Sequence, residues 1–216
     1  MTDDQKATLD QKATLLRYLR HGRKGLLAKL DGLSEYDARR PLTSTGTNLL
    51  GLVKHVASVE LGYFGEVFGR PADRALPWFD DDAEPDADMW VPADQTREEI
   101  IDLHHFSAKH SDATIEELSL DAEGFVPWWG SEGEKVTLHR ILVHMCFETA
   151  RHAGQADILR EGLDGTAGQF PGDSNVTDRT AEQWAEHCAR IEAAAREAAE
   201  RAGEPTPSAA RHALPS

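Results

Sequence analysis

Several features are missing from this 216-residue sequence, and each absence narrows what the protein does. There is no run of about 18 uncharged apolar residues, so we expect no membrane-spanning helix. The first twelve residues are polar and contain no apolar core of a signal peptide, so we do not expect secretion. Only two cysteines occur, Cys146 and Cys188, and they form no CxxC pair, which favours a reducing cytoplasm.

Basic residues are also scarce. The chain has 23 lysines and arginines against 38 acidic residues, a formal net charge of −15. Because nucleic-acid phosphates would be repelled, we do not expect nucleic acid as a partner. The HExxH, GxGxxG, GxxxxGK[ST] and GxSxG motifs are absent, which argues against the commonest metalloproteases, dinucleotide-binding proteins, NTPases and α/β-hydrolases.

Strand patterns are sparse, whereas helical periodicity fills most of the chain. It predicts helices over residues 4–30, 47–68, 96–118, 137–161 and 180–202. We expect Thr45 or Thr47 to cap the second helix, a Thr96–Glu99 capping box to open the third, and Thr137 to cap the fourth. The predicted fold is all-α: a four-helix bundle over residues 1–165, then a loop and an extra C-terminal helix over 166–202, which packs on the bundle or projects from it. A disordered tail follows over 203–216.

Acidic residues gather in the long loop of residues 70–94. The run consists of Asp80, Asp81, Asp82, Glu84, Asp86 and Asp88. We interpret it as a solvated loop, because the glycine and the terminal glutamate of an EF-hand calcium loop are missing. Trp78, Phe79 and Trp90 flank the run and are expected to hold the loop against the rest of the protein.

Two further groups of residues have both structural and functional interpretations. His104, His105 and His110 lie on the third helix, and we expect them at the surface because no second ligand completes a site. Trp128 and Trp129 are adjacent between the third and fourth helices. They either cover the core or form the wall of a cofactor-binding pocket, since ligand pockets favour aromatic walls.

The fourth predicted helix is the most informative segment. It is apolar around most of its girth, which predicts a buried helix. Yet its middle carries His144, Glu148, His152 and Gln155. Because buried polar groups need partners, this local conflict indicates a functional site.

The spacing of these residues suggests a metal site. Glu148 and His152 are four residues apart, so they share a helix face and can bind one cation. In an antiparallel bundle, His55 of the second helix is the obvious third ligand; two histidines and one carboxylate leave an open position, which suits zinc, nickel or ferrous iron. His144 lies about 12 Å from His152 along the axis, too far to share the ion comfortably. A weak surface ion pair is the alternative for Glu148 and His152.

Two segments resemble a known family. Residues 52–57, Leu-Val-Lys-His-Val-Ala, and residues 144–157, from His144 to Asp157, are similar to the DinB/YfiT-like superfamily of four-helix-bundle metalloproteins. The resemblance covers about residues 5 to 162. The combination of two histidines and a glutamate is similar to the N-terminal domain of mycothiol-dependent maleylpyruvate isomerases, which bind zinc. The sequence as a whole most resembles the actinobacterial mini-circle-protein-like branch.

The resemblance implies a divalent metal, zinc first, on His55, Glu148 and His152. It also implies that a low-molecular-weight thiol such as mycothiol is activated for transfer to a small electrophile, or to isomerise it. His144 and Gln155 are then the expected catalytic residues, and the chain is expected to form a homodimer. A hydrolase with metal-bound water and a non-catalytic metal- or ligand-binding helical module are the alternatives.

Overall fold

The computed structural model describes residues 3–205. In chain order the elements are α1 (Asp3–Ala28), α2 (Glu35–Arg39), α3 (Leu49–Phe64), the 3₁₀ helices η1 (Glu66–Phe68) and η2 (Pro77–Phe79), α4 (Arg97–Glu117), β1 (Glu123–Val126), β2 (Glu134–Thr137), α5 (Leu138–Asp164) and α6 (Ala181–Ala202). Helices dominate, which confirms the all-α prediction. None of the described helices combines the length and the apolarity that crossing a membrane requires.

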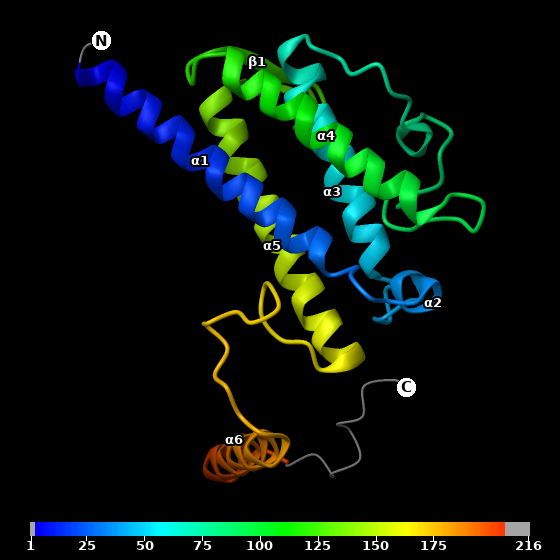
Figure 1. The fold of residues 1–216 in the computed structure, drawn as a ribbon, viewed down its shortest axis with the longest axis vertical. Helices are drawn as coiled ribbons and strands as arrows, with labels where there is room; N and C mark the ends of the chain where they lie inside the picture. The colour runs from blue at the N-terminus through cyan, green and yellow to red at the C-terminus, as the bar shows by residue number, and fades with distance from the viewer. Residues whose placement is uncertain (1–2, 206–216) are drawn as a thin grey trace. The chain divides into compact units, whose positions relative to one another are not determined.

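The chain divides into two compact units, Met1–Pro171 and Gly172–Ser216. The first unit is a bundle of the four long helices α1, α3, α4 and α5 (Figure 1). The second contains α6, which begins at a capping box of Thr180 and Gln183 and ends at Gly203. Residues 206–216 of the predicted disordered tail lie outside the described residues.

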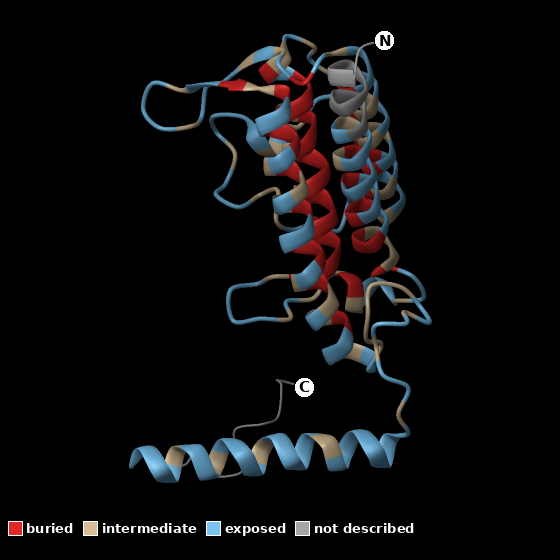
Figure 2. Ribbon diagram, turned by 90° about the vertical axis from the view of Figure 1, so that its left-hand side faces the viewer, coloured by how far each residue is buried: buried red, intermediate tan, exposed pale blue. Residues whose placement is uncertain are grey.

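In the bundle, α1 packs against α4 and α5, and α3 packs against the same two helices. Buried residues line the inner faces of these helices (Figure 2). Three apolar clusters form the core of the described residues, and two of them are large. One lies around the end of α3 and includes Leu19, Phe64, Ile115, Leu138 and Met145; the other lies around its start and includes Leu26, Leu52, Val56, Ile100 and Ala156.

The directions of the helices explain the long loop before α4. Glu60 contacts Ser107, and further along both helices Gly65 approaches His110, so α3 and α4 run in the same direction. Because two parallel neighbours need a crossover connection, the chain must return along the bundle between them. Residues 65–96 make this return, and it carries the acidic run back past α3.

A buried ion-pair network joins three of the helices. The guanidinium of Arg23 on α1 lies 2.8 Å from Glu60 on α3 and 2.6 Å from Asp112 on α4. Arg23 and Glu60 are both almost completely buried. Since removal of one partner would leave a buried charge uncompensated, this network strongly constrains how α1, α3 and α4 pack together.

The start and end of α3 differ from the prediction. Asn48, rather than Thr45 or Thr47, caps the helix, and its side chain accepts a hydrogen bond from the amide of Gly51. The helix ends at Phe64 instead of Phe68, and a single 3₁₀ turn follows it. The caps predicted at Thr96 and Thr137 are confirmed.

The sequence analysis missed a short hairpin between α4 and α5. Strands β1 and β2 pair antiparallel, with Gly124 opposite Val136 and Val126 opposite Glu134. Each strand has only four residues, too few for an alternating pattern to stand out. Val126 and Val136 are buried in the core, so the hairpin closes one end of the bundle.

Two expectations about burial are wrong. The outer face of α5 is exposed, since Phe147 and Ile158 keep 66% and 69% of their accessible surface. Apolar composition therefore overstated how much of this helix the bundle covers. His104, by contrast, was expected at the surface but is only 5% exposed and faces the interior. It lies one turn after the buried Ile100 on α4, so the two residues share the inner face of the helix.

The burial of His104 predicts acid sensitivity. Burial is the main reason that its pKa falls from 6.5 to about 4. Above pH 6.5 the ring is neutral in the folded and in the unfolded protein. Between pH 6.5 and 4 the unfolded chain binds a proton at this histidine and the folded chain does not. We expect this residue alone to remove up to about 3 kcal/mol from the free energy of unfolding over that range.

Chemical denaturation of the native protein and of the His104→Gln variant at pH 7 and pH 4.5 measures this effect. The variant should lose less stability on acidification than the native protein. His139→Gln, a change at an exposed position of α5, is the matched control and should behave as the native protein does. Equal losses in all three proteins would contradict the assignment.

Candidate metal centre

Three predicted ligands come together where α3 faces α5. His55 of α3 and Glu148 and His152 of α5 each offer a ligand atom, and these atoms all lie within 4.8 Å of one another. Nε2 of His152 is 2.9 Å from Oε1 of Glu148, and Nε2 of His55 is 3.7 Å from the same oxygen. The antiparallel packing of α3 and α5 thus produces the grouping that the spacing suggested.

The acidic loop orients His55. Its Nδ1 lies 2.5 Å from Oδ2 of Asp88, at the end of the run 80–88. Burial alone would raise the pKa of Asp88, but the hydrogen bond and charge of His55, together with Lys54, hold that pKa below its ordinary value. An ionised carboxylate can only accept, so Nδ1 of His55 carries the proton and Nε2 presents a lone pair.

Gln155 orients His152 in a similar way. Its Oε1 lies 2.7 Å from Nδ1 of His152, one helical turn away. The ring therefore donates from Nδ1 and directs Nε2 towards Glu148. Partners of this kind on the far ring nitrogen are usual for histidines that bind metals, because they fix the tautomer and the ring orientation.

The donor set fits a divalent cation. With Nδ1 protonated on both rings, two Nε2 lone pairs face one carboxylate oxygen, an arrangement that is repulsive unless a cation or an additional proton lies among them. Burial would raise the pKa of Glu148, but a hydrogen bond from protonated His152 and the positive charge of the two histidines, when protonated, lower it; a divalent cation would supply this positive charge to two neutral rings. A carboxylate and two neutral imidazoles are ligands that zinc accepts.

Lys54 fixes the acidic loop over α3. Its ammonium donates to the carbonyls of Ala87 and Trp90, at 2.8 and 2.9 Å, and lies 4.2 Å from the ring centre of Trp78. Burial lowers the pKa of Lys54 to about 8. These contacts flank Asp88 on both sides, so a buried lysine beside His55 sets the position of the carboxylate that orients it.

Gly51 allows the acidic loop to pack directly against the first turn of α3. A Cβ on this residue would lie 1.8 Å from the carbonyl oxygen of Met89. That carbonyl also accepts a hydrogen bond from the side chain of Asn48. The first turn of α3 and the loop therefore form one packed unit, and the interpretation of the run as fully solvated is wrong for Asp88, whose side chain is 14% exposed.

A cavity of about 690 Å³ opens beside the three predicted ligands. His55 and Glu148 line it, whereas His152 lies behind them. Its other walls are mainly aromatic and apolar, with one guanidinium and two carboxylates among them: Val59, Leu61, Gly62, Tyr63, Glu66, Ala72, Arg74, Leu76, Phe79, Asp80, Trp128 and His144. The open side of the ligand cluster thus faces a space large enough for a small molecule.

The two tryptophans have different positions. Trp128 lines the cavity, while Trp129 packs against the core instead. Their indole nitrogens lie 3.3 and 2.9 Å from the hydroxyl of Tyr63, which holds both rings beside α3. Only Trp128 has the location expected of a ligand-binding residue.

His144 lies at the cavity wall, one turn before Glu148 on α5. Its ring packs edge-on against Tyr63 and Trp129, with ring centres 4.8 and 5.0 Å away. Burial lowers its pKa, so the ring is neutral at pH 7. A neutral imidazole facing a ligand cavity can accept a proton. Cys146 instead donates to the carbonyl of Leu15 on α1, away from the cavity.

Sequence reasoning missed two residues that shape this site, Lys54 and Asp88. Lys54 could have been noticed, because it is a charge inside an otherwise apolar stretch of α3. Asp88 could not, because it has the same residue type and spacing as its solvated neighbours.

Fold and site together define an all-α bundle with a candidate divalent-metal site beside a cavity large enough for a small molecule. Residues 14–165 match the family model of the mycothiol-S-transferases. The match covers more than half of the chain, so this protein belongs to the mycothiol S-transferase family, which is DinB-like and confirms the superfamily resemblance. A comparison with curated proteins gives no match.

The contact between Asp88 and His55 predicts a measurable effect on metal binding. Removing the charge that orients His55 should weaken zinc binding by about 10- to 100-fold, the range typical for residues that hold a ligand histidine. Competition with a chromophoric chelator measures the dissociation constant for zinc in the Asp88→Asn variant. Asp82→Asn, at an exposed position of the same loop, should bind as the native protein does. Equal affinities in both variants would show that Asp88 does not orient the ligand.

Proposed function

We propose that this protein is a metal-dependent thiol S-transferase. It would use a divalent cation, zinc first and nickel or ferrous iron next, and a low-molecular-weight thiol such as mycothiol. The observation that carries the proposal is the convergence of His55, Glu148 and His152 at the edge of a 690 Å³ cavity. Membership of the mycothiol S-transferase family supports the choice of thiol.

In this proposal the metal ligands are His55, Glu148 and His152, and Asp88 and Gln155 fix the tautomers of the two histidines. A bound divalent cation would lower the pKa of the thiol, so that the thiolate exists at neutral pH. The aromatic walls, Trp128 among them, would hold the apolar part of the thiol or of the electrophile and exclude water.

His144 is the residue that we assign to proton transfer. Its neutral ring would accept the proton that the thiol loses on binding, and the resulting thiolate sulfur would then attack an electrophilic carbon. The S–C bond forms while the bond from carbon to the leaving group breaks, and the leaving group departs with the electron pair. His144 can then return the proton to the leaving group. No cysteine of the protein is needed, which agrees with the direction of Cys146 towards α1.

The partners in this proposal are a small thiol and a small electrophile. The low cysteine count supports a reducing, cytoplasmic location. Assembly as a homodimer stays a prediction from the superfamily resemblance.

The proposal predicts thiol consumption that depends on the metal. Protein loaded with zinc should accelerate the loss of mycothiol in the presence of an aryl halide electrophile, and protein treated with a chelator should not. Restoring zinc should restore the rate. His144→Gln should keep its zinc but lose about 100-fold or more in kcat, the usual contribution of a general base, whereas the exposed change His139→Gln should keep both.

Two other results would contradict the proposal. Hydrolysis of an ester by the zinc-loaded protein without any thiol would favour the metal-dependent hydrolase. Zinc bound at one ion per chain, with no acceleration across a panel of thiols and electrophiles, would favour the non-catalytic module.

A further inference from the structure

Helix α6 carries a regular seven-residue repeat of small and apolar residues. The positions follow alternating steps of three and four residues: Ala181, Trp184, Cys188, Ile191, Ala195, Ala198 and Ala202. In heptad notation these are the a and d positions, with Ala181 at the first a. A repeat of 3.5 residues stays on one face only when two helices wind around each other, whereas a helix on a globular core shows a broader stripe.

Within residues 172–205 of the second unit, Arg179 and His187 lie against the ring of Trp184, but no residue of the stripe is buried. No residue of α6 is buried, and Trp184 and Ile191 keep 36% and 57% of their accessible surface. Figure 2 shows the helix as mostly exposed, with a few intermediate positions and none buried. Because a helix of this size gains most of its stability from packing its apolar face, we expect another helix to pack against the stripe.

We propose that α6 pairs in parallel with α6 of a second copy of this chain, forming a two-stranded coiled coil. The residues that flank the stripe indicate that the partner is a second α6 and that the two helices run parallel. In a parallel pair, His187 at position g lies opposite Glu192 of the second copy at position e, where the Nε2–H of the imidazole can donate a hydrogen bond to the carboxylate. The next such pair is Ala194 with Ala199, whose small side chains allow the helices to approach.

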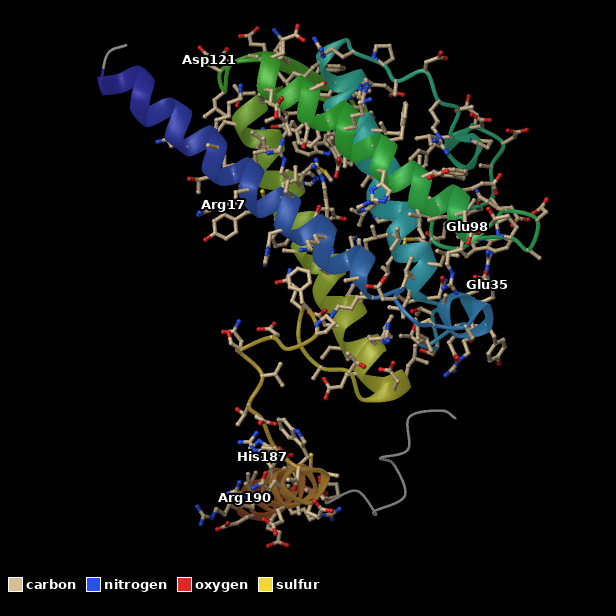
Figure 3. The ribbon with its side chains drawn as sticks, viewed as in Figure 1. Arg17, Glu35, Glu98, Asp121, His187 and Arg190 are labelled. Carbon is tan, nitrogen blue, oxygen red and sulfur yellow. The ribbon has the colours of Figure 1, made fainter. Side chains whose placement is uncertain are left out.

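The antiparallel arrangement is less favourable. With the two helices fully overlapped, Glu192 of one copy would lie opposite Glu192 of the other, and like charges repel. Within each helix Arg201 pairs with Glu197, and Arg196 lies 2.6 Å from Glu192, which lessens this repulsion between the two Glu192 side chains. His187 and Arg190, labelled in Figure 3, lie beside each other on the flank of the stripe.

Net charge favours a second α6 over the outer surface of the bundle. Residues 1–171 carry 30 acidic and 18 basic residues, and α6 carries five glutamates and three arginines. The two parts therefore have the same sign of charge. A second α6 carries a net charge of only 3 − 5 = −2, against 18 − 30 = −12 for residues 1–171, so it repels α6 less than the bundle does.

Light scattering on the full-length protein tests the pairing. The native protein should have about twice the molar mass of the 23.8 kDa chain. Ile191→Glu places a charge at a d position and should halve the measured mass. Ala193→Glu adds the same charge on the outer face of α6 and should leave the mass unchanged. A monomeric native protein at tens of micromolar, or a dimeric Ile191→Glu variant, would overturn the proposal.

Cross-linking through Cys188 provides a second test that changes no residue of the stripe. In a parallel pair the two Cys188 thiols face each other at an a position, so diamide, which takes up their two hydrogens, should join them in a disulfide. In the overlapped antiparallel pair they would lie about 10 Å apart along the axis, beyond the reach of a disulfide. The Cys146→Ser variant keeps Cys188 and should therefore still form the disulfide between the two copies. Failure of the native protein to cross-link would overturn the parallel arrangement.

Discussion

The candidate metal site depends on one constraint: each of the two histidines has its Nδ1 engaged by an oxygen, so both Nε2 atoms face the same carboxylate oxygen. Asp88 sets this for His55, and Gln155 sets it for His152. An imidazole whose far nitrogen is engaged can neither rotate freely nor change tautomer at low cost. The apolar core and the buried Arg23 network place α3 and α5 at the distance where these groups meet.

The topology of the bundle explains why an acidic loop takes part. Since α3 and α4 are parallel, the connection between them must travel back along the bundle, and it passes the middle of α3. Lys54, Asn48 and Gly51 anchor that connection where it crosses the first turns of α3. A loop that would otherwise be a solvated crossover thus supplies a carboxylate to the site, and a buried lysine fixes its position.

The sequence predicted the four long helices well, because their caps and apolar periodicity are strong local signals. It also predicted the meeting of His55, Glu148 and His152, because a four-residue spacing places two of them on one face and antiparallel packing brings the third. The Asp88 contact could not be predicted, since it depends on where a long crossover lies in space. Periodicity missed the four-residue strands of the hairpin, and it misjudged Phe147, Ile158 and His104 because composition does not say which face of a helix its neighbours cover.

The central claim is that His55, Glu148 and His152 hold one divalent cation. Metal analysis of the purified native protein beside a His152→Ala variant tests it most directly, as moles of metal per chain. The account predicts about one zinc, nickel or iron ion per native chain and almost none in the variant. A native protein without metal, even after incubation with zinc, or a variant that keeps its metal, would contradict the account.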